Sequence, residues 1–480
     1  MQEEVALYKD QIAEAVAMGD DELMEKFFSG EEFSDAELKR GVRIGVRNGE
    51  ICPVYSGSAV NSIGIQRLMD LIVDYFPTYS ERGMYTATTP NGVKVELLTS
   101  ETEVLTAQVF KTIVDPFVGR ISYVKVLSGV LAADSTVVNA NNGKPEKISQ
   151  IYIVKGKHQT AAGKLFTGDI GALVKLQNTK TNDTLCDKGK LLMADPITFD
   201  TPMYGQAVVP KTKNDEDRLS NGLARLQEED PTFKVVNNPE TKETVIYGVG
   251  DQHLDVIVNK LNSKFKAEVV LSDPKITYRE TITKTAVGEG RHKKQSGGHG
   301  QYGDVKILFE ARNDGEQDLE FVDKVVGGVV PRNFIPAVEK GLKECMNKGV
   351  LAGYPVIGLK ATLHDGSYHP VDSSEMAFKV AASLAYKKGM EEANPILLEP
   401  IMHAEIVVPN DYMGDIITDI NKKRGRVIGM EPEGEVNQKV IVEVPMAEMF
   451  KYATDLRSIT QGRGNFDMTF ERYEEVPPNE

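Results

Sequence analysis

The sequence of 480 residues contains no tryptophan and only three cysteines. Cys52, Cys186 and Cys345 lie far apart and offer no metal-binding spacing, so a reducing cytosol is the simplest setting for them. No apolar run reaches the ~20 residues that a membrane-spanning helix needs. The acidic start, Met1-Gln-Glu-Glu, is unlike a signal peptide. These absences predict a cytoplasmic protein with no metal site and no membrane partner.

A phosphate-binding loop is also missing from the sequence. The Gly-Lys pairs at 143, 156, 163 and 189 continue into Pro, His, Leu and Leu, so none completes the G-x-x-x-x-G-K-[ST] motif. Without a loop that cradles phosphates and a hydroxyl that binds Mg²⁺, hydrolysis of a nucleotide lacks its main electrostatic parts. We therefore expect no cofactor and no catalytic residue in this chain.

The net charge of −15 argues at first against a nucleic-acid partner, but the charge is unevenly distributed. Residues 1–101 hold 9 Lys and Arg against 18 Asp and Glu, a net charge of −9, so the rest of the chain carries only −6. Within that remainder, basic side chains gather at 291–294, at 422–426, and at Arg457 with Arg463. An acidic body with basic clusters can still bind RNA locally.

Changes of pattern divide the chain into five domains. Residues 1–83 are helical, apart from one short apolar run. Residues 84–200 contain many short β-branched runs and no helix, which is typical of a small β-barrel. Residues 201–277 and 401–480 both predict the βαββαβ order of a ferredoxin-like fold. Residues 278–400 mix helices and strands. The predicted fold is therefore multidomain, α/β and α+β.

The first 83 residues resemble the end of an α/β domain. Ser34-Asp-Ala-Glu37 is a capping box that opens a helix. Residues 51–55 predict one strand, and one strand cannot make a sheet, so its partner strands are absent. The next helix has its apolar positions at 3.6-residue spacing: Ile65, Leu68, Met69, Ile72, Val73 and Phe76. We expect this apolar face to pack on the neighbouring barrel.

The segment from Arg291 to Gly303 is the most informative one. Its four glycines within seven residues leave backbone N–H groups uncovered beside Lys293 and Lys294. Such a loop suits an RNA phosphate backbone or a base edge, although a solvated turn would have the same composition.

A second polar segment spans 366–375. Asp372-Ser-Ser-Glu375 predicts a capping box with Asp372 as the N-cap. His369 has no such structural duty, and on its own it would be an ordinary surface histidine.

These two segments resemble the tip of the fourth domain of bacterial elongation factor G, the GTPase that drives translocation on the ribosome. The resemblance follows the order of that family along essentially the whole chain, including Asp115-Pro-Phe-Val-Gly-Arg120 and Asp183-Thr-Leu-Cys-Asp187 in the barrel. It implies that residues 1–83 are a C-terminal remnant of a P-loop GTPase domain, most of which is lacking. His299 replaces an arginine that is common in the family, which suits a paralogue.

The resemblance also implies which residues bind. Gly57-Ser-Ala-Val60 is similar to the last guanine-contacting motif, so Ser58, Ala59 and Val60 are its remnant; by spacing alone they form a turn. The residues that would contact RNA at the tip are Lys293, Lys294, Gln295, Ser296, Gly297, Gly298, His299, Gly300, Gln301 and His369. Those that would contact ribosomal RNA near the C-terminus are Lys423, Arg424, Arg426, Arg457 and Arg463. Basic residues at 422–426 also suit a helix end, with Gly425 just beyond it.

The implied function is that of the ribosome-binding body of an elongation factor G-like GTPase that promotes translocation of tRNA and mRNA. Its partners would be the ribosome, ribosomal RNA and tRNA, it would act as a monomer, and GTP with Mg²⁺ would belong to the full-length family. An alternative within the superfamily is a ribosomal protection protein, which dislodges an antibiotic. A metabolic enzyme that uses His299 and His369 is disfavoured, because no cofactor fingerprint or nucleophile motif accompanies them.

Overall fold

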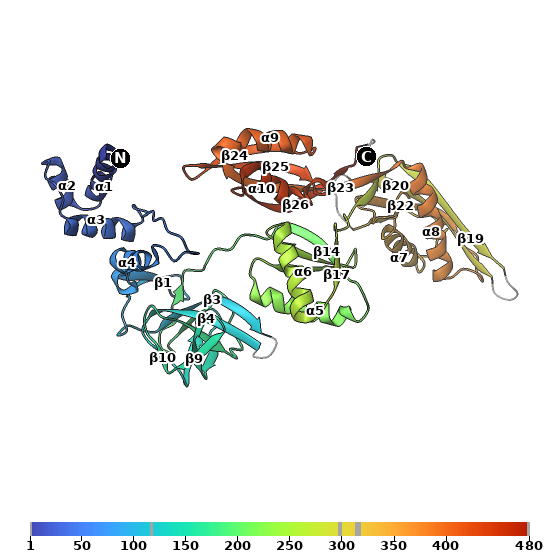
Figure 1. Cartoon of the computed structure of the whole chain (residues 1–480). Coiled ribbons are helices and arrows are strands. Elements are labelled where there is room, and N and C mark those ends of the chain that lie inside the picture. The colour runs from blue at the N-terminus through green and yellow to red at the C-terminus, as the bar shows by residue number, and fades with distance from the viewer. Residues whose placement is uncertain (1, 116–118, 296–299, 313–317, 478–480) are drawn as a thin grey trace. The chain divides into compact units, whose positions relative to one another are not determined.

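The computed structural model describes residues 2–115, 119–295, 300–312 and 318–477 (Figure 1). The chain divides into two compact units, Met1–Thr198 and Phe199–Glu480. Both units combine helices with sheets, so the chain is a multidomain protein of mixed α and β structure. Among the described residues, no helix has both the length and the apolar character needed to cross a membrane.

Four helices open the first unit: α1 (Gln2–Ala17), α2 (Asp21–Phe28), α3 (Asp35–Asn48) and α4 (Ile65–Tyr75). The capping box predicted at Ser34 is confirmed. The Ser34 hydroxyl accepts the Glu37 N–H, and the Glu37 carboxylate accepts the Ser34 N–H at 2.8 Å. Helix α3 ends at Gly49, where φ is +78°, a conformation that glycine adopts without a steric penalty.

The strand expected at 51–55 is wrong, because this segment has no regular structure. The turn that follows it contains an isolated bridge between Ser58 and Ile63. An extended segment needs a neighbouring strand to satisfy its backbone N–H and C=O groups. No described residue pairs with 51–55 in a strand.

The expectation that helix α4 packs on the barrel is also wrong. Its apolar side chains are exposed, for example Met69 at 58% and Ile72 at 50%. The contact with the barrel is made instead by Tyr79 in the 3-10 turn η1 (Tyr79–Arg82). The Tyr79 hydroxyl donates to the Leu127 carbonyl at 3.2 Å, and the Lys125 ammonium lies 4.6 Å from the centre of the ring.

The rest of the first unit is all β. A three-stranded sheet consists of β1 (Met84–Thr88), β2 (Lys94–Leu98) and β13 (Met193–Ala194). A two-stranded sheet pairs β5 (Leu131–Ala132) with β10 (Lys164–Leu165). An antiparallel sheet of eight strands has the order β7-β6-β12-β3-β4-β11-β8-β9. Its strands in chain order are β3 (Thr106–Asp115), β4 (Gly119–Ser128), β6 (Ser135–Asn139), β7 (Pro145–Ile148), β8 (Ile151–Lys155), β9 (His158–Ala162), β11 (Ile170–Val174) and β12 (Thr184–Cys186).

Two parts of the second unit share one topology, the antiparallel strand order 2-3-1-4. The first part consists of β14 (Tyr204–Pro210), α5 (Asp215–Glu229), β15 (Lys234–Asn238), β16 (Glu243–Gly248), α6 (Asp251–Phe265) and β17 (Val269–Ser272). The last part consists of β23 (Pro395–Pro409), α9 (Met413–Lys422), β24 (Arg426–Glu433), β25 (Asn437–Pro445), α10 (Tyr452–Thr460) and β26 (Asn465–Glu475). Both place two helices on one face of a four-stranded sheet, and strand β18 (Arg279–Ile282) extends the last sheet by pairing with β23.

Between these parts lies a four-stranded sheet with the order β19-β20-β22-β21. Its elements are β19 (Ala286–Lys294), β20 (Gln301–Ala311), β21 (Glu320–Asp323), α7 (Ile335–Met346), β22 (Leu359–Ser367) and α8 (Glu375–Glu392). Helices α7 and α8 pack in one core with β20 and β22, and the hairpin β19–β20 runs along α8 (Figure 1). Glycines make this approach possible, since a Cβ added at Gly290 would lie 1.9 Å from the Ala381 carbonyl oxygen.

A hydrogen-bonded pair anchors the start of α6. His253 Nε2 lies 2.9 Å from the Asp230 carboxylate, and its Nδ1 accepts the Val249 N–H at 3.2 Å. Burial alone would raise the pKa of Asp230, but hydrogen bonds from His253 and Thr232 outweigh it and lower the pKa to about 2. A carboxyl group whose pKa is lowered on folding stabilises the fold in its ionised form.

We predict that Asp230→Asn makes the stability of the second unit less dependent on pH. The native pKa of about 2 lies below the ordinary value of 3.8, so the ionised group contributes about 2 kcal/mol at neutral pH. That contribution is lost as the pH falls from about 5 towards 2. Denaturant unfolding of both proteins at several pH values should give curves that converge in acid. A difference in the free energy of unfolding that stays constant with pH would contradict this prediction. The control is Asp217→Asn, at an exposed position of helix α5.

We predict that Gly290→Ala destabilises the second unit by about 1–3 kcal/mol or more, because the new methyl group would overlap the backbone of α8. Gly414→Ala, in the first turn of α9, is the matched control. A Cβ there meets no atom within 4 Å, so the change should be neutral or stabilising. Denaturant midpoints measure both variants, and equal shifts for the two would refute the close contact.

Candidate nucleic-acid interface

The first tip segment lies at the end of the β19–β20 hairpin, where Lys294 pairs with Gln301 and Lys293 with Tyr302. The predicted residues Ser296, Gly297, Gly298 and His299 lie outside the described residues. Lys293, Lys294 and Gln295 are exposed, and neither lysine forms an ion pair with a described residue. Their positive charge is therefore available to a partner.

The second tip segment differs from its prediction. Helix α8 begins at Glu375 after the N-cap Ser374, whose hydroxyl accepts the Ala377 N–H at 3.2 Å. The capping box expected with Asp372 as N-cap is therefore wrong. The Asp372 carboxylate instead accepts the N–H of Gly300 at 2.9 Å, across 72 residues of sequence. The Asp372 carboxylate therefore binds the N–H of Gly300 instead of capping helix α8.

His369 lies next to this contact. Its side chain is 52% exposed, and its Nδ1 accepts the N–H groups of Val371 at 3.3 Å and of Asp372 at 3.2 Å. One Asp372 carboxylate oxygen is 3.3 Å from the same nitrogen. The structure thus brings His369 and Gly300 to one place, as the two predicted tip segments require.

Three residues whose contacts the sequence did not predict, Tyr302, Ser367 and Asp304, hold the two segments together. The Tyr302 hydroxyl lies 2.7 Å from Ser367 Oγ, which donates to Asp304 Oδ2 at 2.7 Å. The Arg291 guanidinium lies over the Tyr302 ring at 5.6 Å. The tyrosine among the glycines was the signal, since an aromatic residue in a polar loop needs a packing partner.

The basic residues at 423–426 are held in ion pairs. Lys423 contacts Asp455 at 2.8 Å, Arg424 contacts the buried Glu399 at 2.6 Å, and Arg426 contacts Glu443 at 3.0 Å. A hydrogen bond from Arg472 lowers the pKa of Glu443 to about 2, with further help from Arg426.

The helix end at 422–426 also departs from expectation. The residue with positive φ is Arg424, at +58°, and not Gly425. A Cβ at Gly425 would lie 2.6 Å from the Ile420 side chain, so glycine is required there by packing.

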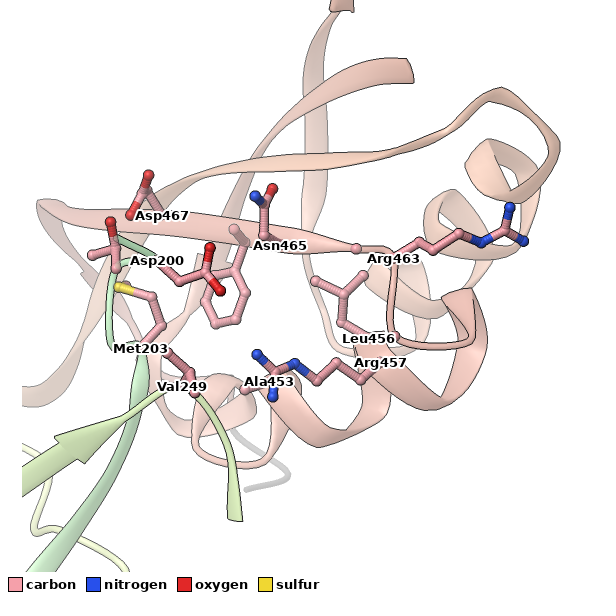
Figure 2. Close-up of a pocket in the computed structure, with 13 residues that line it drawn as sticks. Asp200, Met203, Val249, Ala453, Leu456, Arg457, Arg463, Asn465 and Asp467 are labelled. Atoms are coloured by element: carbon pink, nitrogen blue, oxygen red, sulfur yellow. The ribbon is translucent and has the colours of Figure 1, made fainter. Parts of the chain in front are cut away.

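Arg457 and Arg463 border a cavity of about 210 Å³ within the second unit (Figure 2). Arg457 points into it from α10 and lies close to Gly250 at the start of α6, whereas Arg463 points away. The Arg463 guanidinium lies over the Tyr412 ring at 4.9 Å. The carboxylates of Asp200 and Asp467 also line the cavity, so its charge is mixed.

The remaining predicted residues, Ser58, Ala59 and Val60, form part of a turn after the irregular segment at 51–57. Val60 is 95% exposed, and the Ser58 hydroxyl accepts the Asn61 N–H at 3.3 Å. Among the described residues, no group of three or more His, Cys, Asp and Glu side chains could hold a metal ion.

Comparisons with known proteins cover most of the chain. Family models match for elongation factor G domain 2 (residues 104–188), domain III (199–273), domain IV (274–394) and the C-terminus (396–480). An elongation factor G-like protein of Thermotoga maritima is 47% identical over 471 residues, which are 98% of this chain and 69% of that protein. A crystal structure of a Thermus thermophilus protein is also similar, with a TM-score of 0.71 and 36% identity. The match covers all of this chain and 69% of the Thermus thermophilus chain. The chain therefore belongs to the elongation factor G family.

Proposed function

We propose that this chain is the ribosome-binding body of an elongation factor G-like GTPase that promotes translocation of tRNA and mRNA. We use the name tip for the described residues of 291–304 and 366–375. The observation that supports the proposal is the structure of this tip. Two segments far apart in the sequence meet there and present unpaired lysines beside a half-exposed histidine. Cationic and hydrogen-bonding groups on a rigid support suit RNA recognition.

The role of the tip is mechanical, and no described residue needs to act as a catalytic group. GTP and Mg²⁺ would be held by parts of the family's protein outside residues 1–480, and hydrolysis there would favour one arrangement of the domains over another. The tip couples to that change if its RNA contacts differ between the two arrangements. The partners would then be the ribosome, its RNA and tRNA.

Within the C-terminal part, the proposal favours Arg463 over the residues at 423–426 as a contact to ribosomal RNA, whereas Arg457 points into the cavity that Asp200 and Asp467 also line. Lys423, Arg424 and Arg426 already face carboxylates. An RNA phosphate would have to replace those partners, and for Arg424 this means breaking a pair with Glu399, whose side chain is only 5% exposed. Arg463 instead contacts the Tyr412 side chain and the Thr460 carbonyl, so no described carboxylate compensates its charge.

We predict that Lys293→Ala with Lys294→Ala weakens ribosome binding and reduces its salt dependence. The logarithm of the binding constant falls linearly with the logarithm of the salt concentration, and each lost phosphate contact should make this slope less steep by about 0.7–0.9. The double variant Lys387→Ala with Lys388→Ala is the matched control. It removes the same charge from the exposed side of α8, roughly 18 Å along the helix from its tip end. Equal slopes for both double variants would show that the tip lysines do not contact RNA.

We also predict that His369→Ala slows translocation in a protein that carries this chain together with its GTPase domain. The expected effect is about tenfold, the size of one lost hydrogen bond. Ribosome-stimulated GTP hydrolysis should stay near the wild-type rate, because the histidine belongs to the tip and not to the part that would hold the nucleotide. Single-round translocation and GTPase assays measure the two effects. A wild-type translocation rate would refute the proposed function, and activity only in antibiotic release would favour a protection protein.

A further inference from the structure

Asp372 has a role at the tip that its sequence context conceals. The pattern Asp-x-x-Glu predicts a helix cap, but Ser374 occupies the cap position of α8. The Asp372 carboxylate therefore does not cap helix α8. It is partly buried, with 27% of its side chain exposed, and it faces the other tip segment.

Three hydrogen bonds join Asp372 and Ser373 to Gly300 and Tyr302 of the first tip segment. The Gly300 N–H donates to Asp372 Oδ1 at 2.9 Å, and the Tyr302 N–H donates to the Asp372 carbonyl at 2.8 Å. The Ser373 hydroxyl donates to the Tyr302 carbonyl at 2.9 Å, beside a parallel bridge between Tyr302 and Ser373. A Cβ on Gly300 would lie 3.0 Å from the Asp372 carboxylate, so glycine fits the contact closely.

The same turn orients His369. Its Nδ1 accepts two backbone N–H groups, and one of these belongs to Asp372. Because two N–H donors face Nδ1, the neutral tautomer that this turn favours carries its proton on Nε2, although the Asp372 carboxylate oxygen 3.3 Å from Nδ1 would favour the other tautomer. No described residue is a partner of that Nε2, and half of the side chain is exposed. The ring is therefore prepared to donate a hydrogen bond outward.

We propose that Asp372 is a positioning residue. It ties Gly300 to the turn before α8, and its fixed backbone holds His369 so that Nε2–H is offered as a donor to an acceptor oxygen of RNA. The last step rests on the function proposed above, whereas the hydrogen bonds and the tautomer can be tested without a ribosome. The Tyr302 ring lies beside the His369 ring, with centroids 6.4 Å apart, and Tyr302 is itself held by Ser367 and by the Arg291 guanidinium.

The first test compares Asp372→Ala with Ser374→Ala in the 480-residue chain. We expect Asp372→Ala to speed amide hydrogen exchange at Gly300 about tenfold or more, with little change in thermal stability, whereas Tyr302, whose N–H donates to the backbone carbonyl of residue 372, is the internal reference. Ser374→Ala should lower the thermal stability, because it removes the true helix cap, and should leave amide exchange at Gly300 unchanged. Asp372→Asn keeps an acceptor oxygen and should restore slow exchange at Gly300. Unchanged exchange in Asp372→Ala, or a loss of stability as large as that of Ser374→Ala, would overturn the assignment.

The second test reads the tautomer directly. The ¹⁵N resonances of the neutral His369 ring should show an unprotonated Nδ1 and a protonated Nε2 in the native chain. Asp372→Ala should move them towards the values of a mobile histidine. A protonated Nδ1 in the neutral native ring would refute the inferred donor.

The third test measures translocation in a protein that includes the GTPase domain. We expect Asp372→Ala to slow translocation as His369→Ala does, and the double variant to be no slower than either single variant. Ser374→Ala should translocate at the wild-type rate. If His369→Ala has no effect, the proposed function fails although the exchange result stands. If only Asp372→Ala lacks an effect, the positioning role alone fails.

Discussion

The close approach of strand β19 to helix α8 is the constraint on which the tip depends. A Cβ at Gly288 would lie 2.0 Å from the Ala385 carbonyl oxygen, and one at Gly303 would lie 2.7 Å from that of Ala377. Glycines on the strands therefore let the hairpin lie directly on the backbone of the helix, one turn after another. Because packed interiors do not deform continuously, the direction of the hairpin follows that of α8. The two tip segments can meet only because strand and helix already run together.

The base of the same region is fixed by a buried carboxylate. Glu280 is fully buried and accepts N–H groups from a single loop, at 2.9 Å from Leu351, 2.8 Å from Ala352, 2.7 Å from Gly353 and 3.0 Å from Tyr354. Its neighbour Arg279 contacts Glu240 and lies over the Tyr473 ring at 5.3 Å. Buried charges persist when each is paired or fully hydrogen-bonded. Strand β18 thus anchors the hairpin sheet to the elements before and after it.

Local patterns in the sequence predicted the elements well and their partners poorly. Ser34 and Asp372 both open a pattern with Glu three residues later, yet only Ser34 forms the box. The difference is a donor 72 residues away, the Gly300 N–H, which no local rule could include. Periodicity likewise found helix α4 and its apolar face, but it could not say what covers that face. The strand expected at 51–55 failed for the same reason, because pairing is a property of two segments.

Charge was the feature of the candidate site most easily misread from the sequence. The cluster 422–426 and the pair Lys293 and Lys294 look alike as runs of positive charge. In the fold, strand register brings Arg426 opposite Glu443, and a turn with positive φ aims Arg424 at Glu399. The register partners of Lys294 and Lys293 are Gln301 and Tyr302, so no described carboxylate lies opposite them on the hairpin. A basic run is available to a partner only where the fold supplies no acidic neighbour, and Lys293 and Lys294 meet that condition among the described residues.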